Sequence, residues 1–232
     1  MVNNKPQLIL IHGALGNALQ MDVLAQNAKS VYDVYCFQCP YHDGKPVELN
    51  KFTIPHFSNA LLNFITENNL IKPKVFGYSM GGYVALQLAH DHPGRAVKII
   101  TLGTKYSWNP EAAAKEVRMM NPDVIEQKIP AFAATLMARH QPSNWKNIMN
   151  RTAEMMTELG GGKAMIETDF ASIENEVLVC IGTDDHMVSI EESERTAKQL
   201  KNGRLKIIEG FKHPLEAVDK NMLASICNEF FQ

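Results

Sequence analysis

Short apolar runs alternate with longer amphipathic segments along most of the chain. The apolar runs are typical of β-strands, which we expect at residues 7–12, 31–37, 74–78, 97–102, 176–181 and 204–209. The segments between them carry apolar residues at helical spacing, and we expect helices at residues 19–30, 52–70, 80–92, 188–201 and 214–231. Strands that alternate with helices pair in parallel, so the pattern predicts an α/β fold. Its sheet should be mainly parallel, with about six strands and with helices on both faces.

The alternation breaks between the fourth and fifth predicted strands. From residue 107 to residue 162 the pattern is helical throughout, and the segment contains both tryptophans, Trp108 and Trp145. It ends in the run Gly160, Gly161 and Gly162, which is compatible with a hinge or with a helix cap. We therefore expect a helical insertion into the α/β domain at this point.

Composition limits the classes of protein that the chain could belong to. It has 232 residues, of which 45% are hydrophobic and 21% charged, and this suits a single domain with a large core. The formal net charge of −2 gives no sign of the basic surface that nucleic-acid binding needs. The apolar run from Leu8 to Ile11 is shorter than a signal-peptide core or a membrane span. We expect a cytoplasmic protein that binds neither nucleic acid nor membrane, and the oligomeric state stays open.

The cysteines could indicate redox chemistry, because Cys36 and Cys39 form a CxxC pair. However, the stretch YDVYCFQCP is typical of a strand, and residues three apart on a strand face opposite sides. A redox CxxC instead lies at a helix N-terminus. We therefore interpret both residues, together with Cys180 and Cys227, as small apolar side chains in a reducing compartment.

A serine surrounded by glycines lies where the third predicted strand meets the next helix, in KVFGYSMGGYVAL. Gly77 and Gly81 flank Ser79 in the pattern G-x-S-x-G, a sharp turn that presents a nucleophilic serine above a sheet. Glycine removes the side chains that so tight a turn would bring into contact. The following helix points its N-terminus at the serine and favours negative charge there. An incidental serine in a glycine-rich turn is the alternative, but the flanking strand and helix favour a nucleophile.

A serine nucleophile needs a base within hydrogen-bond reach, and the base needs an acid to orient it. His213 follows the last predicted strand, in EGFKHPLEAVD, where parallel sheets build their sites. Asp184 and Asp185 follow the fifth predicted strand, in VLVCIGTDDHMV, and either could orient His213. His186 is a rival base, although its place beside the aspartates disfavours it. Five other histidines lack such a placement: His42, His56, His90, His92 and His140.

Acyl transfer at a serine creates an oxyanion, which backbone N–H groups stabilise. We expect one donor to be the amide of Met80, the residue after the serine. The second should come from the loop after the first strand, in LILIHGALGN, and we expect Ala14 there. His12 in the same loop is expected to be structural and to bond to the nearby backbone. Such a site requires no metal and no cofactor.

Four motifs, HGALGN, GYSMGG, GTDDHMV and FKHPLEAVD, occur in this order. Together with the order of strands and helices, they resemble the α/β-hydrolase superfamily over nearly the whole chain outside residues 107–162. The resemblance implies Ser79 as nucleophile, His213 as base and Asp185 as acid, because in relatives the acid is the aspartate three positions after the glycine, here Gly182. A serine nucleophile separates this chain from the dehalogenase and epoxide-hydrolase branches, which use an aspartate.

The resemblance also implies a division of the chain. Relatives carry a helical lid where residues 107–162 lie, so we expect residues 1–106 and 163–232 to form the core and 107–162 the lid. Relatives often have two further strands before the HG strand, whereas here only six residues precede it. We therefore expect a reduced sheet of six strands.

The leading hypothesis for function is a serine hydrolase that cleaves a small or medium acyl ester through an acyl-enzyme. Its expected partner is a small-molecule acyl substrate. One alternative is a carbon–carbon bond hydrolase, a thioesterase or a lyase of this fold, acting on a carboxylated substrate that a lid arginine could hold: Arg118, Arg139 or Arg151. Another alternative, by similarity to plant hormone receptors of this fold, is a ligand receptor with slow turnover.

Overall fold

The computed structural model describes residues 5–45, 52–142 and 144–232. Within these residues, six parallel strands form one sheet in the spatial order β2-β1-β3-β4-β5-β6. They are β1 (Gln7–Ile11), β2 (Asp33–Phe37), β3 (Lys74–Tyr78), β4 (Lys98–Leu102), β5 (Glu176–Asp184) and β6 (Asn202–Lys212). The α/β class and the six-stranded parallel sheet are therefore confirmed.

The last two strands run further than their apolar residues indicate. β5 and β6 stay paired to Asp184 and Lys212, with a register shift between Gly182 and Asp184. A Cβ on Gly182 would lie 2.0 Å from the carbonyl oxygen of Phe211, so the two backbones approach closely there. The apolar pattern ends earlier because most of this extension is polar or glycine: Phe211 is buried in the core, whereas Thr183 and Lys212 are exposed. Pairing there continues through backbone hydrogen bonds, which do not depend on apolar side chains.

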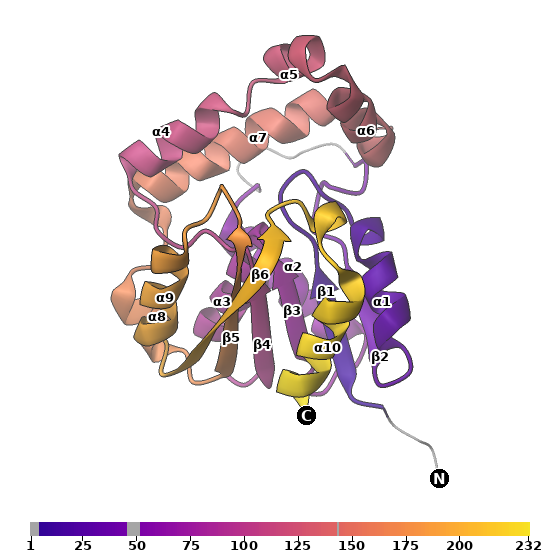
Figure 1. Ribbon diagram of the computed structural model, residues 1–232, viewed down its shortest axis with the longest axis vertical. Coiled ribbons are helices and arrows are strands. Elements are labelled where there is room, and N and C mark those ends of the chain that lie inside the picture. The colour runs from indigo at the N-terminus through magenta and orange to yellow at the C-terminus, as the bar shows by residue number, and fades with distance from the viewer. Residues whose placement is uncertain (1–4, 46–51, 143) are drawn as a thin grey trace.

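Helices bury both faces of the sheet (Figure 1). On β1, Leu8 and Leu10 pack on one face, whereas Ile9 and Ile11 pack on the other. This two-sided burial is why the strands consist of nearly continuous apolar runs. One face carries α1 (Asp22–Ala28) and α10 (Lys220–Phe231), and the other carries α2 (Ile54–Glu67), α3 (Met80–Asp91), α8 (Glu167–Ser172) and α9 (Ile190–Gln199).

The final helix is shorter than the sequence predicts. A 3-10 turn spans Leu215–Ala217, and α10 begins only at Lys220. Asp219 separates the two, because its side chain accepts hydrogen bonds from the amides of Asn221 at 2.8 Å and Met222 at 3.2 Å. Such an N-cap supplies acceptors for amides that have no partner within the helix. The region just after β6 is therefore a turn that presents His213 rather than a continuous helix.

In the part of the chain that the structure describes, four α-helices follow β4 and lie across the carboxyl end of the sheet (Figure 1). They are α4 (Pro110–Arg118), α5 (Pro122–Lys128), α6 (Pro130–His140) and α7 (Trp145–Glu158). Asparagine side chains cap the first, second and fourth of them, at Asn109, Asn121 and Asn144. A proline at the first position of α4, α5 and α6 suits the start of a helix, where its missing N–H costs nothing.

The glycine run closes this helical segment. A Cβ on Gly160 would lie 2.4 Å from the Cβ of Ala113, so the chain there packs tightly against α4. Gly162 has a φ of +99°, which glycine adopts without strain. The run therefore combines a close helix contact with a left-handed turn back towards the core.

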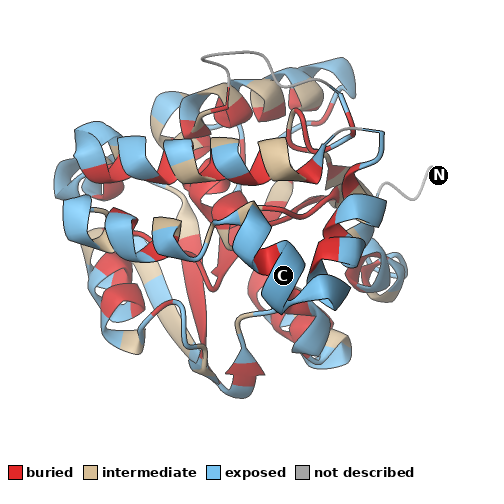
Figure 2. Cartoon of the chain, turned by 90° about the horizontal axis from the view of Figure 1, so that it is seen from above, coloured by how far each residue is buried: buried red, intermediate tan, exposed pale blue. Residues whose placement is uncertain are grey.

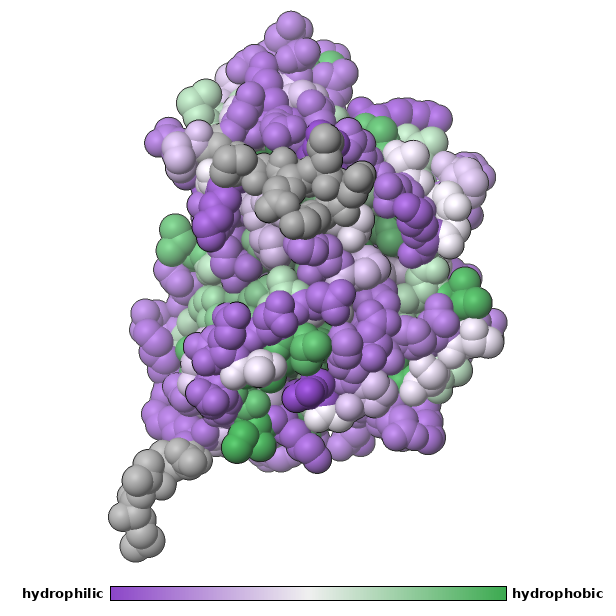
Figure 3. Space-filling view, turned by 180° about the vertical axis from the view of Figure 1, so that it is seen from behind, coloured by the Kyte–Doolittle hydropathy of each residue, from purple (hydrophilic) through white to green (hydrophobic). Residues whose placement is uncertain are grey.

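The helices over the sheet are amphipathic. Along α7, Trp145, Ile148, Met149 and Met155 are buried, and bands of buried and exposed residues alternate in the view from above (Figure 2). Seen from behind, the surface is mainly hydrophilic, with apolar residues in small separate patches (Figure 3). None of the helices within the described residues is long and apolar enough to cross a bilayer.

Gly77 at the end of β3 has no room for a side chain. A Cβ there would lie 2.4 Å from both the Gly81 carbonyl oxygen and the Gly82 amide nitrogen, which are backbone atoms and cannot rotate away. We expect Gly77→Ala to lower the free energy of unfolding by about 3 kcal/mol, because the strand and α3 must move apart. Chemical denaturation measures this. Gly161→Ala is the matched control, since a Cβ there meets nothing within 4 Å, and equal stability of the two variants would contradict the prediction.

Candidate active site

Ser79 occupies the turn between β3 and α3. Its φ of 51° and ψ of −118° are unusual for a residue with a side chain and cost on the order of 1–3 kcal/mol. The surrounding backbone holds it there. Its amide donates to the Leu102 carbonyl at 2.8 Å, and its own carbonyl accepts from the Gly82 amide at 3.0 Å and the Thr104 hydroxyl at 2.9 Å. The serine thus has the strained backbone that its sequence motif predicts.

His213 and Asp185 form a hydrogen-bonded pair. The distance from His213 Nδ1 to Asp185 Oδ2 is 2.8 Å, and the side chains are 11% and 2% exposed. The other carboxylate oxygen, Oδ1, accepts from the amides of Met187 at 2.8 Å and Val188 at 2.9 Å. Burial raises the pKa of the Asp185 carboxyl, but the His213 hydrogen bond and charge and the two amides outweigh this, so the pKa lies below its usual value.

The structure distinguishes the two neighbouring aspartates. Asp184 is the last residue of β5 and stands opposite Lys212 in the ladder, and its side chain accepts from the Thr183 hydroxyl at 3.2 Å. Asp185 is the first residue beyond the strand and turns towards His213. His186, the rival base in the sequence, is exposed.

Neighbouring groups hold His213 in place. The Tyr78 hydroxyl donates to the His213 carbonyl at 2.9 Å, and the two rings lie 5.6 Å apart between centroids. Gly103 packs against the pair, because a Cβ on it would lie 3.1 Å from Asp185 Oδ2 and 3.3 Å from His213 Nδ1. With Nδ1 donating to the carboxylate, Nε2 is the ring nitrogen that can accept a proton from a nucleophile.

The loop after β1 lies beside the serine. His12 Nε2 accepts from the Cys39 amide at 3.1 Å, so Nδ1 carries the proton and donates to the Gly13 carbonyl at 2.8 Å. Burial lowers the pKa of His12 to about 4, which keeps the ring neutral. His12 is therefore structural, as its place in the sequence predicts. Ala14 follows in this loop and lines the same cavity as Ser79 and Met80.

Helix α6 braces this loop through contacts that sequence reasoning missed. Leu15 has a φ of +57°, and its carbonyl accepts from Arg139 Nη1 at 2.9 Å and bonds to His140 Nε2 at 3.1 Å. Arg139 also pairs with Glu216, just after His213 in the chain, at 3.2 Å. One arginine thus connects the helical insertion, the loop after β1 and the loop of His213. No short motif could reveal this, because the partners lie far apart in the chain.

One cavity joins the expected site residues to the helical insertion. Ser79, His213, Met80 and Ala14 line it on the side of the sheet, and Asp185 stands behind His213. The remaining wall is mostly apolar: Ile54, Tyr83, Trp108, Met155, Met156, Leu159, Met187 and Val188. Two charged side chains, Lys105 and Glu116, also face it. The arrangement offers a nucleophile, a base with its acid, backbone donors and an apolar space.

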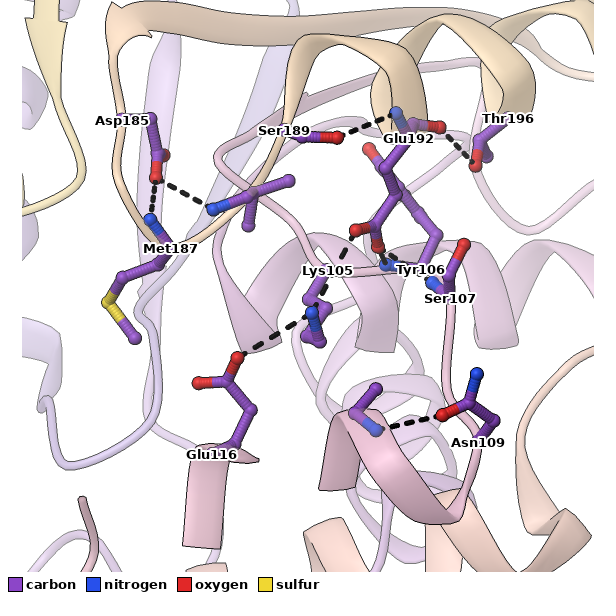
Figure 4. A network of polar contacts seen from close by, with 12 residues as sticks. Lys105, Tyr106, Ser107, Asn109, Glu116, Asp185, Met187, Ser189, Glu192 and Thr196 are labelled. Carbon is purple, nitrogen blue, oxygen red and sulfur yellow. Dashed lines mark hydrogen bonds and ion pairs between the residues drawn. The ribbon is translucent and has the colours of Figure 1, made fainter. Parts of the chain in front are cut away.

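Lys105 stands between two buried carboxylates (Figure 4). Its Nζ lies 3.6 Å from Glu116 Oε1 on α4 and 3.8 Å from Glu192 Oε2 on α9. Glu192 Oε1 also accepts from the amides of Tyr106 at 2.6 Å and Ser107 at 2.7 Å, where the chain leaves β4 for the insertion. Sequence reasoning did not find this cluster, because charged residues on amphipathic helices usually face solvent.

The three arginines considered as carboxylate ligands are absent from the described lining of the cavity. Arg118 is exposed, Arg139 is engaged with Leu15 and Glu216, and Arg151 pairs with Glu154 at 2.5 Å.

The cysteines contribute no redox pair. All four are free thiols. Burial raises the pKa of Cys36 to about 11 and that of Cys180 to about 12, so the reactive thiolate is disfavoured. This agrees with their interpretation as packing residues.

Comparison with known proteins agrees with the fold. The sequence profile of the family described as alpha/beta hydrolase fold matches residues 6–144. Since this is more than half of the chain, the chain belongs to the alpha/beta hydrolase fold family.

Among curated proteins, the chain is 32% identical over 114 residues to a pimeloyl-[acyl-carrier protein] methyl ester esterase of Aromatoleum aromaticum. That match covers 48% of this chain and 43% of the relative, so the chain matches less than half of that protein's length.

Among solved structures, a putative lipase from Acinetobacter baumannii AYE superposes with a TM-score of 0.83 at 18% identity, covering 98% of this chain and 83% of that one. MenH from S. aureus superposes with a TM-score of 0.77 at 16% identity, covering 99% and 94%. At 16% and 18% identity, these similarities show a shared fold and no more.

Proposed function

We propose that the protein is a serine hydrolase that cleaves a small or medium acyl ester. The observation that carries this proposal is the His213–Asp185 pair, whose histidine lines an apolar cavity together with the strained Ser79. A partly buried, oriented histidine beside a serine on a sharp turn is the arrangement that activates a hydroxyl for attack on a carbonyl. The esterase relative supports an ester as the bond that is cleaved.

In the proposed reaction, Ser79 Oγ attacks the ester carbonyl while His213 Nε2 takes the hydroxyl proton. The amides of Met80 and Ala14 stabilise the oxyanion that forms. As the C–O bond breaks, His213 returns the proton to the leaving alcohol, and an acyl-enzyme remains on Ser79. Water, deprotonated by His213, then attacks the acyl carbonyl. The bond to Ser79 Oγ breaks, His213 returns the proton to Oγ, and the acid leaves. Asp185 keeps the imidazole oriented and stabilises its charged form.

The apolar wall indicates where the acyl chain binds. Trp108, Met155, Met156 and Leu159 lie in or next to the helical insertion and face the cavity. Methionine adapts its shape easily, so such a wall accepts more than one chain length up to a limit. We therefore propose that residues 107–162 act as a lid that sets substrate size, with 1–106 and 163–232 as the catalytic core.

A carboxylated substrate, as for the carbon–carbon hydrolase, thioesterase or lyase alternatives, has less support. None of the arginines among the described residues lines the cavity, and its one lysine is already paired with carboxylates. The apolar surface patches of Figure 3 give no specific support to a receptor that recruits a partner.

The test is hydrolysis of p-nitrophenyl esters from acetate to dodecanoate, together with labelling by a fluorophosphonate. We expect the rate to peak at one chain length, because the cavity is bounded by the lid. We also expect one phosphonyl group per chain, located on the Ser79 peptide by mass spectrometry. Labelling of a residue other than Ser79, or no hydrolysis at any acyl length, would contradict the proposed ester hydrolase and favour the alternative functions.

A further inference from the structure

The wall of the cavity is not wholly apolar and also carries charge. Apart from His213, the charged side chains among the described lining residues are Lys105 and Glu116. Glu116 is only 3% exposed although it lies on α4, a helix of the insertion. A buried carboxylate at a substrate cavity decides which groups can enter, because its charge acts through a medium that screens weakly.

The positive charge of Lys105 is already matched. Its Nζ faces Glu116 at 3.6 Å and Glu192 at 3.8 Å, so one ammonium stands against two carboxylates (Figure 4). When all three groups are ionised, the cluster has an excess of one negative charge. The lysine therefore has no unmatched charge to offer to an anionic ligand.

The two carboxylates differ in how they are held. Glu192 accepts two backbone hydrogen bonds besides its contact with Lys105, which keep it in place at the base of the insertion. Glu116 lines the cavity, and its contact in the described structure is with Lys105. Glu116 is thus the carboxylate that a bound acyl chain would meet.

We propose that Glu116 makes this site selective for esters of uncharged acyl chains. The inference rests on the proposed ester hydrolysis and specifies its substrate class. A carboxylate on the acyl chain would have to lose its hydration in an apolar cavity and approach a cluster that is already negative. An uncharged chain meets neither obstacle. Removing the charge of Glu116 would leave Lys105 facing Glu192 alone, so the cluster would have no excess negative charge and would repel an anionic chain less. The preference for uncharged chains should therefore weaken.

The experiment compares two esters of equal acyl length on the full-length protein: p-nitrophenyl hexanoate and mono-p-nitrophenyl adipate, which adds a terminal carboxylate. The readout is the ratio of their kcat/KM values, with Ser79→Ala giving the background for each. We expect the wild type to prefer the hexanoate ester. In Glu116→Gln, which keeps the shape and removes the charge, the ratio should move towards the adipate ester by about tenfold or more.

Three further measurements make the result specific. Glu111→Gln makes the same charge change at an exposed position on the same helix and should leave the ratio unchanged. Lys105→Met in the Glu116→Gln background should abolish the gain for the adipate ester. The shift should also persist at high ionic strength, because buried pairs are screened less than surface charges. If the glutamine variant does not fold, Glu116→Met repeats the test.

The outcomes separate the two proposals. Hydrolysis that does not depend on Ser79 would overturn the proposed function. Hydrolysis that depends on Ser79, with equal rates for both esters in the wild type, would overturn only the selectivity. If Glu116→Gln and Glu111→Gln change the ratio of kcat/KM values by the same factor, the selectivity is also overturned. The ratio would then depend on the charge of the surface and not on the charge in the cavity.

Discussion

Replacing Ser79 by alanine is expected to lower kcat for the preferred ester by about 10⁶-fold, the scale seen when a serine nucleophile is removed. The hydroxyl is the atom that bonds to the acyl group, whereas the turn that presents it is held by backbone contacts to Leu102, Gly82 and the Thr104 hydroxyl. Those contacts remain in the variant, so stability should change little.

Steady-state kinetics and thermal unfolding measure the two effects separately. Ser172→Ala, at an exposed position on α8, is a control for the loss of a hydroxyl away from the site. Turnover by Ser79→Ala at a rate near that of the wild type would rule out the acyl-enzyme and with it the proposed mechanism.

Asp185→Asn is expected to lower kcat by about 10³- to 10⁴-fold with little change in KM, as for the corresponding change in other serine triads. The contacts of Asp185 explain why. Oδ1 accepts from the amides of Met187 and Val188, so the carbonyl oxygen of an asparagine would stay there. Its NH₂ group would then face His213 Nδ1 and donate to it. This moves the ring proton to Nε2, the nitrogen that must accept the proton of Ser79.

The matched control is the adjacent Asp184→Asn, which makes the same chemical change in a side chain bonded to Thr183. We expect its kcat to stay within about threefold of the wild type, as for surface changes that touch no reacting group. A larger loss in Asp184→Asn than in Asp185→Asn would contradict the assignment of the acid.

The choice between these aspartates shows where local sequence stops being informative. Both follow an apolar run, and chemically they are identical. The resemblance to relatives favours Asp185, but the physical reason appears only in the sheet. Because β5 continues through a register shift to Asp184, that residue is committed to the ladder opposite Lys212, and Asp185 is the first residue free to turn towards His213.

The charged side chains of the insertion show the same limit. Glu116 and Arg139 lie in the segment that the apolar pattern predicts to be helical. The pattern does not show that Glu116 faces the cavity or that Arg139 braces the loop after β1. Their partners lie on other elements, so their burial depends on how the helices pack and not on the residues beside them. Sequence reasoning considered Arg139 only as a ligand for a carboxylated substrate.

The sequence by itself determined the α/β architecture, the six parallel strands and the glycine-flanked turn at Ser79. These features follow from apolar periodicity and from backbone preferences, which act over a few residues. The residues themselves left Asp184 and Asp185 open, and the tertiary structure placed Asp185 against His213. The tertiary structure alone decided that α6 supports the loop of Ala14 and that Lys105 stands between Glu116 and Glu192. Each of these contacts joins segments distant in the chain, and only packing of the whole domain determines which of them meet.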